Sequence, residues 1–131
     1  MKMIKVIPLC TVFLFLTVGN LFAQNNSDQI LGEWVRADNT KTVEVFKEND
    51  KYSAKIIETK NKQQLGKLIV WGLQYDNKEK EWSDGEVQLP DMSHSASCYV
   101  KLKGEKLIIT GYHGLRLFGS SQTYSRKKQQ I

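Results

Sequence analysis

Short stretches in which apolar and polar residues alternate recur along most of the chain. Within residues 51–60, Tyr52, Ala54 and Ile56 share one face, and the residues between them are polar. A period of two is typical of a strand with one buried face. Such stretches return at roughly the 8–12-residue spacing typical of β-sandwiches and β-barrels. They predict strands over residues 32–36, 41–48, 51–60, 67–73, 86–89, 96–102, 106–112, 115–117 and 122–126.

The connections between these stretches are short and polar, which favours antiparallel neighbours. Asn49 and Asp50 tolerate the dihedral angles of a tight turn, and Gly104 marks another hairpin. Residues 68–71 form a contiguous apolar run that fits either a buried strand or a short helical turn. No stretch shows a convincing helical period, and the polar residues 24–29 predict a frayed lead-in. The sequence therefore predicts an all-β fold of about eight short antiparallel strands. A closed up-and-down barrel is favoured because it removes exposed edges, and an open sandwich is the alternative.

The first residues have the pattern of a secretory signal peptide. Lys2 and Lys5 precede a long apolar run, and Ala23 supplies a small residue at a cleavage site. A single membrane anchor is the alternative, but the run is short for a span and no second long apolar run follows. We therefore expect residues 1–23 to be removed and residues 24–131 to form one exported domain, periplasmic or extracellular.

Charge and cysteine content narrow the classes of function. The leader holds two of the 19 basic residues in the 131-residue chain and none of its 14 acids, so the domain carries a net charge of +3. Arg126, Lys127 and Lys128 place three positive charges at its end, so the body is near neutral and gives poor support for a nucleic-acid partner. Cys98 is the single cysteine after the leader, so no internal disulfide is possible. The core must therefore hold by packing.

The two ends of the predicted barrel carry a paired motif. Gly32-Glu33-Trp34 opens the first strand, and Arg126 ends the last one. This pair resembles the G-x-W motif and terminal basic residue of the calycins, the lipocalin-like barrels. In those barrels the Trp closes one end and the Arg packs across it, which suits a guanidinium stacked on an indole face. The resemblance assigns Gly32, Trp34 and Arg126 to closure of a calycin-like barrel.

A second resemblance covers nearly the whole predicted domain. The matching stretches are residues 31–34, 43–46, 52–56, 71–73, 82–87 and 107–114 running into 117–126. They resemble a family of small secreted bacterial proteins called domain of unknown function 2147, which implies an exported barrel-like domain with no established activity. The chain departs from the family at residues 93–96, and at Thr110, Ser120 and Tyr124, where the family often carries Arg, Arg and Trp. If those positions form a family site, this chain keeps only part of it.

Residues suited to covalent or metal chemistry are few. Cys98, His94 and His113 are the candidates for nucleophilic catalysis, but Cys98 shares the apolar face of its strand, which favours a buried hydrophobic role. His94, Cys98 and Asp91 lack the paired, closely spaced ligands of a structural zinc site. The carboxylates on the predicted strands single out no pair for glycoside hydrolysis. The sequence therefore predicts no catalytic residue, no metal and no cofactor.

Aromatic residues are numerous, and such residues either fill barrel interiors or line ligand pockets. An eight-stranded barrel is wide enough either to be filled by side chains or to hold one small ligand. One hypothesis is a filled barrel that serves as a structural or protein-interaction module of the cell envelope. The other is an exported, non-enzymatic barrel whose mouth holds a small, mostly apolar or aromatic molecule. The candidate ligand-binding residues are Tyr52, Trp71, His94, Tyr112 and Arg116. The sequence leaves the ligand and the oligomeric state open.

Overall fold

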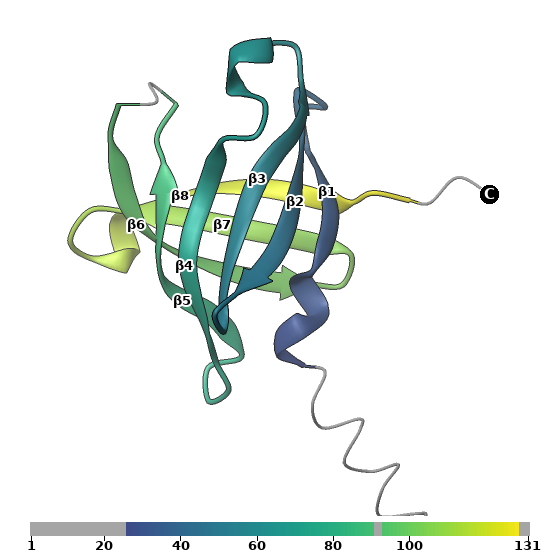
Figure 1. The fold of residues 1–131 in the computed structure, drawn as a ribbon. Helices are drawn as coiled ribbons and strands as arrows, with labels where there is room; N and C mark the ends of the chain where they lie inside the picture. The colour runs from purple at the N-terminus through teal and green to yellow at the C-terminus, as the bar shows by residue number, and fades with distance from the viewer. Residues whose placement is uncertain (1–25, 91–92, 129–131) are drawn as a thin grey trace, which may run out of the picture.

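Residues 26–90 and 93–128 are described by a computed structural model, and the predicted leader lies outside them. They form a closed barrel of eight antiparallel strands joined in sequence order (Figure 1). The strands are β1 (Gly32–Arg36), β2 (Lys41–Glu48), β3 (Lys51–Thr59), β4 (Leu68–Asp76), β5 (Glu81–Gln88), β6 (Ser95–Lys103), β7 (Lys106–Tyr112) and β8 (Ser120–Arg126). Short 3-10 helices are η2 (Ser27–Ile30), η3 (Lys62–Gln64) and η4 (Arg116–Phe118). The predicted all-β, up-and-down barrel is confirmed. None of the described helices has the length and apolar character needed to span a membrane.

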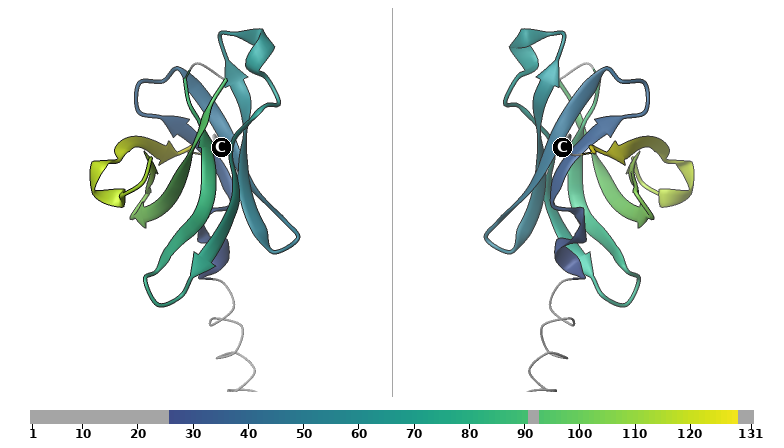
Figure 2. Two further views of the ribbon diagram at one scale, coloured as in Figure 1. Left: turned by 90° about the vertical axis from the view of Figure 1, so that its left-hand side faces the viewer. Right: turned by 90° about the vertical axis from the view of Figure 1, so that its right-hand side faces the viewer.

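Strand β1 closes the barrel because it pairs on both sides. Trp34 lies opposite Val43 on β2 and opposite Arg126 on β8. Figures 1 and 2 show β7 and β8 running across the steeper strands β2 to β5 on the other side of the barrel. In an up-and-down barrel, alternate connections meet at the same end. The β1–β2, β3–β4, β5–β6 and β7–β8 connections form the rim that we call the open end, and η2 covers the opposite, closed end.

Local sequence explains most of these elements. Tyr52, Ala54 and Ile56 on β3 are all buried, as the period of two predicts. The β2–β3 turn places Asn49 and Asp50 at φ values of 51° and 64°. Two consecutive positive φ values are the signature of the hairpin turn whose twist matches that of its flanking strands. Asn and Asp tolerate this conformation at small cost, which fixes the register of the hairpin.

Strand β5 begins earlier than the sequence predicts. The predicted strand starts at residue 86, whereas β5 starts at Glu81. Asp84 adopts a φ of 62°, and the β5–β6 register shifts between Trp82 and Gly85. The resulting bulge places both Trp82 and Gly85 in buried positions, three residues apart. A bulge breaks the period of two, so alternation could not reveal the first half of this strand.

The prediction of a strand at residues 115–117 is wrong. This stretch lies in the β7–β8 connection and includes the start of η4. It follows Gly114, whose φ of 77° turns the chain out of β7. Leu115 and Leu117 are 66% and 85% exposed, so their apolar character does not mark a buried strand face.

The prediction of a frayed lead-in is also wrong for the described part of that stretch. Residues from Ser27 onward form η2, and Ile30 is buried in the core. The backbone carbonyl of Ser27 accepts a hydrogen bond from Trp82 Nε1 at 2.9 Å. Asp28 Oδ1 accepts one from the Tyr52 hydroxyl at 2.5 Å. Polar composition concealed this role because the segment is held mainly through its backbone carbonyls and through one carboxylate.

Candidate functional site

The closed end of the barrel is filled with large side chains. Trp34 has 0% exposure, and Tyr52, Ile56, Trp82 and Leu107 are buried with it. Trp34 Nε1 donates to the carbonyl of Ile30 at 2.9 Å, so the indole is both packed and hydrogen-bonded. η2 therefore covers this end, and the core side chains fill the barrel interior beneath it.

Arg126 spans the closed end from β8. Its guanidinium carbon lies 4.2 Å from the centroid of the Trp34 ring. Its terminal nitrogens donate to the carbonyls of Gln29 at 2.7 Å and Leu31 at 3.3 Å. The planar guanidinium therefore stacks on the indole and holds the backbone on both sides of Ile30. Gly32 adopts a φ of 121°, a conformation that other residues avoid, and a Cβ there would lie 3.6 Å from Arg126.

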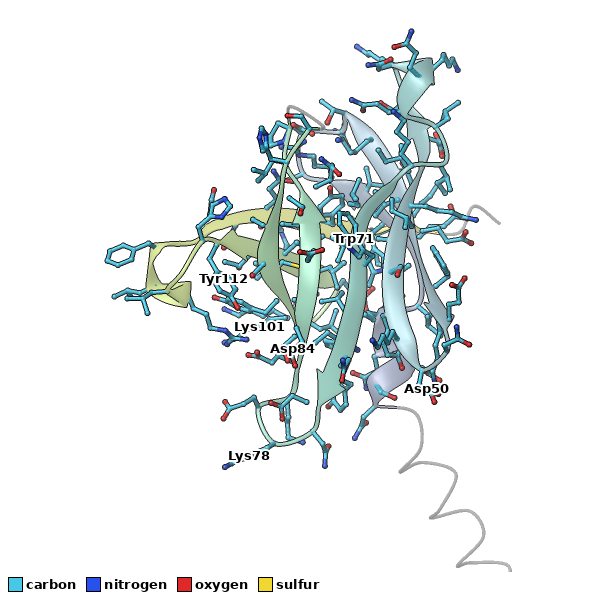
Figure 3. All side chains as sticks on the ribbon, turned by 60° about the vertical axis from the view of Figure 1, so that its left-hand side comes forward. Asp50, Trp71, Lys78, Asp84, Lys101 and Tyr112 are labelled. Atoms are coloured by element: carbon cyan, nitrogen blue, oxygen red, sulfur yellow. The ribbon has the colours of Figure 1, made fainter. Side chains whose placement is uncertain are left out.

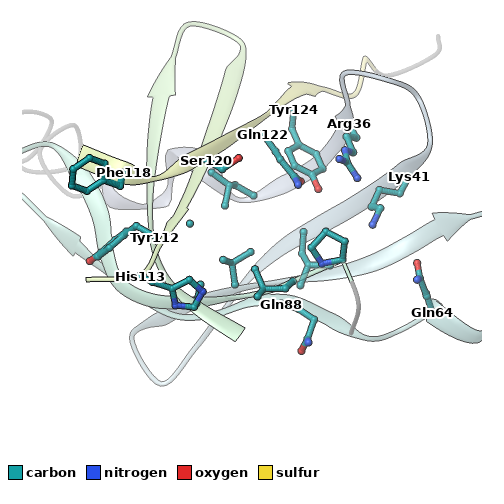
Figure 4. Close-up of a pocket in the computed structure, with 17 residues that line it drawn as sticks. Arg36, Lys41, Gln64, Gln88, Tyr112, His113, Phe118, Ser120, Gln122 and Tyr124 are labelled. Carbon is teal, nitrogen blue, oxygen red and sulfur yellow. The ribbon is translucent and has the colours of Figure 1, made fainter. Parts of the chain in front are cut away.

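The open end contains a cavity of about 400 Å³. Three of the four connections of the rim, those between β3 and β4, β5 and β6, and β7 and β8, contribute to its wall together with residues of the strands (Figure 4). Its apolar surface comes mainly from Ile69, Val87, Ala96 and Ile109, on four successive strands. The remaining lining residues are Arg36, Lys41, Gln64, Gln88, Leu89, Pro90, Gly111, Tyr112, His113, Phe118, Ser120, Gln122 and Tyr124. This volume falls in the range of small-molecule sites, so the barrel is hollow at its open end.

Polar groups in the cavity wall gather on the first two strands and the last one. Arg36 lies opposite Tyr124 in the β1–β8 ladder, and Lys41 begins β2 beside the end of β1. Figure 4 shows these three side chains together at one side of the cavity. Burial is the main cause that lowers the pKa of Lys41, and the neighbouring Arg36 charge lowers it further. Burial raises the pKa of Tyr124 to about 12, so its hydroxyl is neutral at ordinary pH.

The opposite side of the rim is more apolar. Figure 4 places Tyr112, His113 and Phe118 there, from the end of β7 and the connection to β8. Phe118 is 76% exposed, so its ring stands at the entrance. Gly111 also lines this wall, where an added Cβ would come within 2.9 Å of Val87 Cγ1. The space left by Gly111 is therefore taken by Val87.

The predicted ligand-binding residues do not gather around this cavity. Tyr112 lines it, whereas the Tyr52 side chain is buried at the closed end against Asp28. Trp71 is half-buried on β4, and its Nε1 donates to Glu86 on β5 at 3.0 Å (Figure 3). Gly72, with a φ of 76°, follows Trp71 and interrupts the alternation of β4. Tyr52 and Trp71 therefore lie outside the cavity wall.

Arg116 and His94 are also placed away from the cavity wall. Arg116 pairs with the buried carboxylate of Glu81, and its guanidinium carbon lies 4.0 Å from the Tyr99 ring centroid. The hydrogen bonds with Glu81 and then with Tyr112 raise the pKa of Arg116. This contact ties the β7–β8 connection to the outer face of β5 and β6. The backbone carbonyl of His94 accepts bonds from the Leu89 amide at 2.9 Å and the Gln88 side chain at 2.8 Å, which shapes the β5–β6 connection.

The residues considered for catalysis or metal binding do not form a site in the described chain. Cys98 is 1% exposed, and burial raises the pKa of its thiol to about 12, the opposite of an activated nucleophile. His94 and His113 are exposed on two different connections of the rim. Across residues 26–90 and 93–128, no group of three His, Cys, Asp or Glu side chains is arranged to hold a metal ion. Asp91 lies outside the described residues.

Sequence reasoning did not single out Arg36 or Lys41 as site residues, and it named Tyr124 as a departure from the family pattern and not as a ligand-binding residue. A signal for two of them was present, because Arg36 and Tyr124 are each two residues from the closure pair Trp34 and Arg126 on the same strands. Residues two apart on a strand share a face, so both side chains had to point into the barrel.

The comparisons with known proteins agree with this architecture. The chain is similar in structure to the Helicobacter pylori protein HP1028, which is described as belonging to the lipocalin family. The match has a TM-score of 0.61 and 15% sequence identity, and it covers 76% of this chain and 84% of that one. At such a low sequence identity, the match supports a shared fold and nothing further. A comparison with curated proteins finds no match. Residues 32–126 match a family described as uncharacterized proteins conserved in bacteria (DUF2147). The chain therefore belongs to the DUF2147 family and folds as a lipocalin-like barrel, as both sequence resemblances predict.

Proposed function

We propose that this protein is an exported, non-enzymatic barrel that binds one small, mostly apolar molecule in the cavity of its open end. The observation that carries the proposal is the cavity of about 400 Å³, whose inner wall is apolar and whose rim is polar. Sites that bury small molecules share this composition. The lipocalin-like fold of the barrel is consistent with this use.

Further observations support export and a binding role. Export is supported by the amino-terminal pattern of two lysines, an apolar run and Ala23. A binding rather than catalytic role is supported by the position of Cys98, which is buried and has a raised thiol pKa. His113 is the cavity-lining residue best suited to proton transfer, and it stands at the exposed rim. A binding protein needs no such chemistry in its wall.

The cavity can be tested by filling it. N-phenyl-1-naphthylamine is a small uncharged probe whose fluorescence rises in apolar surroundings. Ala96 is buried in the cavity wall, so Ala96→Phe should lower the affinity for this probe at least about tenfold without a loss of stability. The matched control is Ala37→Phe, because Ala37 is exposed in the β1–β2 connection and does not line the cavity. Equal probe binding in both variants would refute binding inside the barrel.

Native mass spectrometry of the protein purified from its own source addresses the natural ligand. We expect a reproducible small adduct that is lost from the Ala96→Phe variant and kept by Ala37→Phe. Protein free of any adduct in repeated preparations, together with absent probe binding, would contradict the proposal.

A second candidate function rests on the β7–β8 connection. Leu115, Leu117 and Phe118 are 66%, 85% and 76% exposed, and they group three large apolar side chains on one protruding segment. Exposed apolar groups of this kind mark interaction surfaces. An envelope interaction module predicts that Leu115→Ser with Leu117→Ser reduces co-sedimentation with isolated envelopes while probe binding in the cavity is unchanged. Unchanged co-sedimentation would remove this second candidate.

A further inference from the structure

The cavity has a charged corner that an uncharged ligand would not use. Arg36 and Trp34 are two residues apart on β1, and Lys41 and Val43 are two apart on β2. Trp34 and Val43 point into the barrel and face each other in the β1–β2 ladder. Arg36 and Lys41 lie one step closer to the open end, and both line the cavity. Two cations therefore meet at the cavity wall (Figure 4).

No carboxylate balances these charges inside the cavity. Among the described residues that line it there is no Asp or Glu. Asp38 in the β1–β2 connection is a nearby carboxylate: its Oδ2 lies 3.5 Å from Arg36 Nε, its side chain is 52% exposed, and its charge partly offsets the effects that lower the pKa of Lys41. Asp38 Oδ1 is bonded to the Thr40 amide at 3.0 Å and to the Thr40 hydroxyl at 2.6 Å. A guanidinium has five N–H donors, so one distant partner leaves most of them available to a ligand.

Tyr124 adds an unused donor at the same corner. The residue is 1% exposed, and it lies opposite Arg36 in the β1–β8 ladder. Within the described part of the chain, no hydrogen bond joins its hydroxyl to another group. Figure 4 shows the hydroxyl directed into the cavity. None of the described residues has a buried side-chain polar atom without a partner, so this hydroxyl is accessible from the cavity and can donate to a ligand acceptor there.

The environment of Lys41 also favours a bound anion. Burial and the nearby Arg36 charge both oppose its charged form, which lowers its pKa. An anion placed between the two side chains would reverse the second effect and offset the first. The corner therefore has two positive charges and one hydroxyl donor, and what it lacks is an acceptor that carries negative charge.

From this arrangement we propose that the ligand is an amphipathic anion of the carboxylate class, with its acidic head group against Arg36, Lys41 and Tyr124. The apolar body then lies along Ile69, Val87, Ala96 and Ile109, which line the rest of the cavity. This inference rests on the proposed function, since it names the class of molecule that the same cavity binds. A medium-chain fatty acid or an aromatic acid has the required chemistry and fits about 400 Å³.

Two matched probe pairs test the charge of the ligand separately from the cavity. Anilinonaphthalene sulfonate is N-phenyl-1-naphthylamine with an added sulfonate, and decanoate differs from decanol at its head group alone. Decanoate should displace N-phenyl-1-naphthylamine from the wild-type protein at about tenfold lower concentration than decanol does. It should also bind the sulfonate probe more tightly than the uncharged one. Both preferences should weaken with added salt, because the head-group contacts are partly solvated.

Variants then assign the preference to the corner. Arg36→Gln with Lys41→Gln should abolish the preference for decanoate over decanol, measured as the ratio of the concentrations that displace the probe. Tyr124→Phe should reduce the same preference several-fold, since it removes one donor and no charge. Lys103→Gln is the matched charge control, because Lys103 is exposed at the far end of β6. Thermal melts confirm that each variant is folded.

The outcomes separate the two proposals. Binding of N-phenyl-1-naphthylamine with equal displacement by decanoate and decanol overturns the anionic ligand and keeps the apolar cavity. A preference for decanoate that survives Arg36→Gln with Lys41→Gln, or that is lost equally in Lys103→Gln, also overturns it. Failure of every probe to bind overturns the proposed function and this inference with it.

Discussion

The two ends of this barrel are built from the same strands and differ in how their inward positions are used. At the closed end, Trp34 and Arg126 occupy neighbouring inward positions on β1 and β8, and they stack on each other under η2. Two residues further along the same two strands, Arg36 and Tyr124 occupy the equivalent positions at the open end. There the aromatic and the cation both line the cavity.

This difference shows how one small domain can hold both a core and a binding site. A chain of this size has little stability to spare, so large inward side chains must be concentrated where they pack completely. The closed end does this, with each of three polar aromatic groups hydrogen-bonded to η2. The open end carries smaller residues such as Ala96 and Gly111, and its polar groups are left for a partner. Substitutions of the same kind should therefore have unequal effects at the two ends.

The largest difference in stability effect between the two ends is expected when aromatic residues are replaced by alanine. Trp34→Ala removes a fully buried indole and the surface on which Arg126 stacks, and it should lower the free energy of unfolding by about 3–5 kcal/mol. Phe118→Ala at the open rim should change it by less than about 0.5 kcal/mol, because the ring is mostly exposed. Urea unfolding measures both values. Folded Trp34→Ala protein should still bind the uncharged probe, and similar losses of stability in the two variants would contradict the division of the barrel.

A second difference concerns the loss of folding stability at alkaline pH. Burial raises the pKa of Cys98 and of Tyr124 to about 12, from ordinary values of 9.0 and 10.0. Because the folded-state pKa is the higher one, the stability contribution is complete below the unfolded-state pKa. It is lost as pH rises towards 12. Between pH 8 and pH 11, wild-type protein should lose on the order of 2–4 kcal/mol through these two groups.

The two groups can be separated by substitution. Cys98→Ala should remove a larger share of the alkaline loss than Tyr124→Phe, because the pKa of Cys98 rises to about 12 from 9.0 and that of Tyr124 from 10.0. Urea unfolding at pH 8 and pH 11 gives both shares. If Tyr124→Phe abolished none of the loss, water would be entering the open cavity and solvating the Tyr124 hydroxyl.

Sequence pattern was sufficient for the fold wherever alternation was unbroken. Strands β1, β2 and β7 have the bounds that the pattern predicts. It failed at the Asp84 bulge, which hid the first half of β5, and at the exposed leucines of the β7–β8 connection. In both cases the cause is physical, since alternation reports burial on a regular strand and neither stretch is one.

Sequence pattern was weaker for the candidate site. Alternation tells which face of a strand points inward, but it does not tell the height of a residue along the barrel axis. Tyr52 does point inward, as the pattern indicates, yet it lies at the closed end, where its hydroxyl bonds Asp28. Arg36 lies at the open end, where an inward cation borders the cavity. The register between strands sets these heights, and register depends on contacts across the sheet that a single chain read in order does not show.

A third inequality is expected for the two arginines on β1 and β8. Arg126→Lys keeps the charge but loses the planar stack on Trp34 and the paired bonds to the Gln29 and Leu31 carbonyls. It should cost about 1–2 kcal/mol of stability. Arg36→Lys should cost less than about 0.5 kcal/mol, because its ion pair with Asp38 is on the surface. Chemical denaturation resolves the pair. A double-mutant cycle between Arg126→Lys and Trp34→Phe should show coupling, and strict additivity would argue against the stack as the source of the effect.

The smallest effect comes from removing one oxygen atom at each end. Tyr52→Phe deletes the hydroxyl that donates to Asp28 Oδ1 at 2.5 Å, and it should cost about 1 kcal/mol. The hydrogen bond from Tyr52 is also the main cause that lowers the pKa of Asp28, so the variant should raise that pKa. Since a lowered carboxyl pKa contributes stability that is lost on acidification, the difference from wild type should shrink as pH falls through the Asp28 pKa.

Tyr124→Phe makes the same change at the open end, where the hydroxyl has no partner within the described residues, and it should leave stability equal or slightly higher. Equilibrium unfolding of both variants in the same buffer distinguishes the two ends by this single atom. A clear loss of stability in Tyr124→Phe without ligand would mean that its hydroxyl is already satisfied in the apo protein. The charged corner of the cavity would then need an acceptor supplied by the chain itself and not by a bound anion.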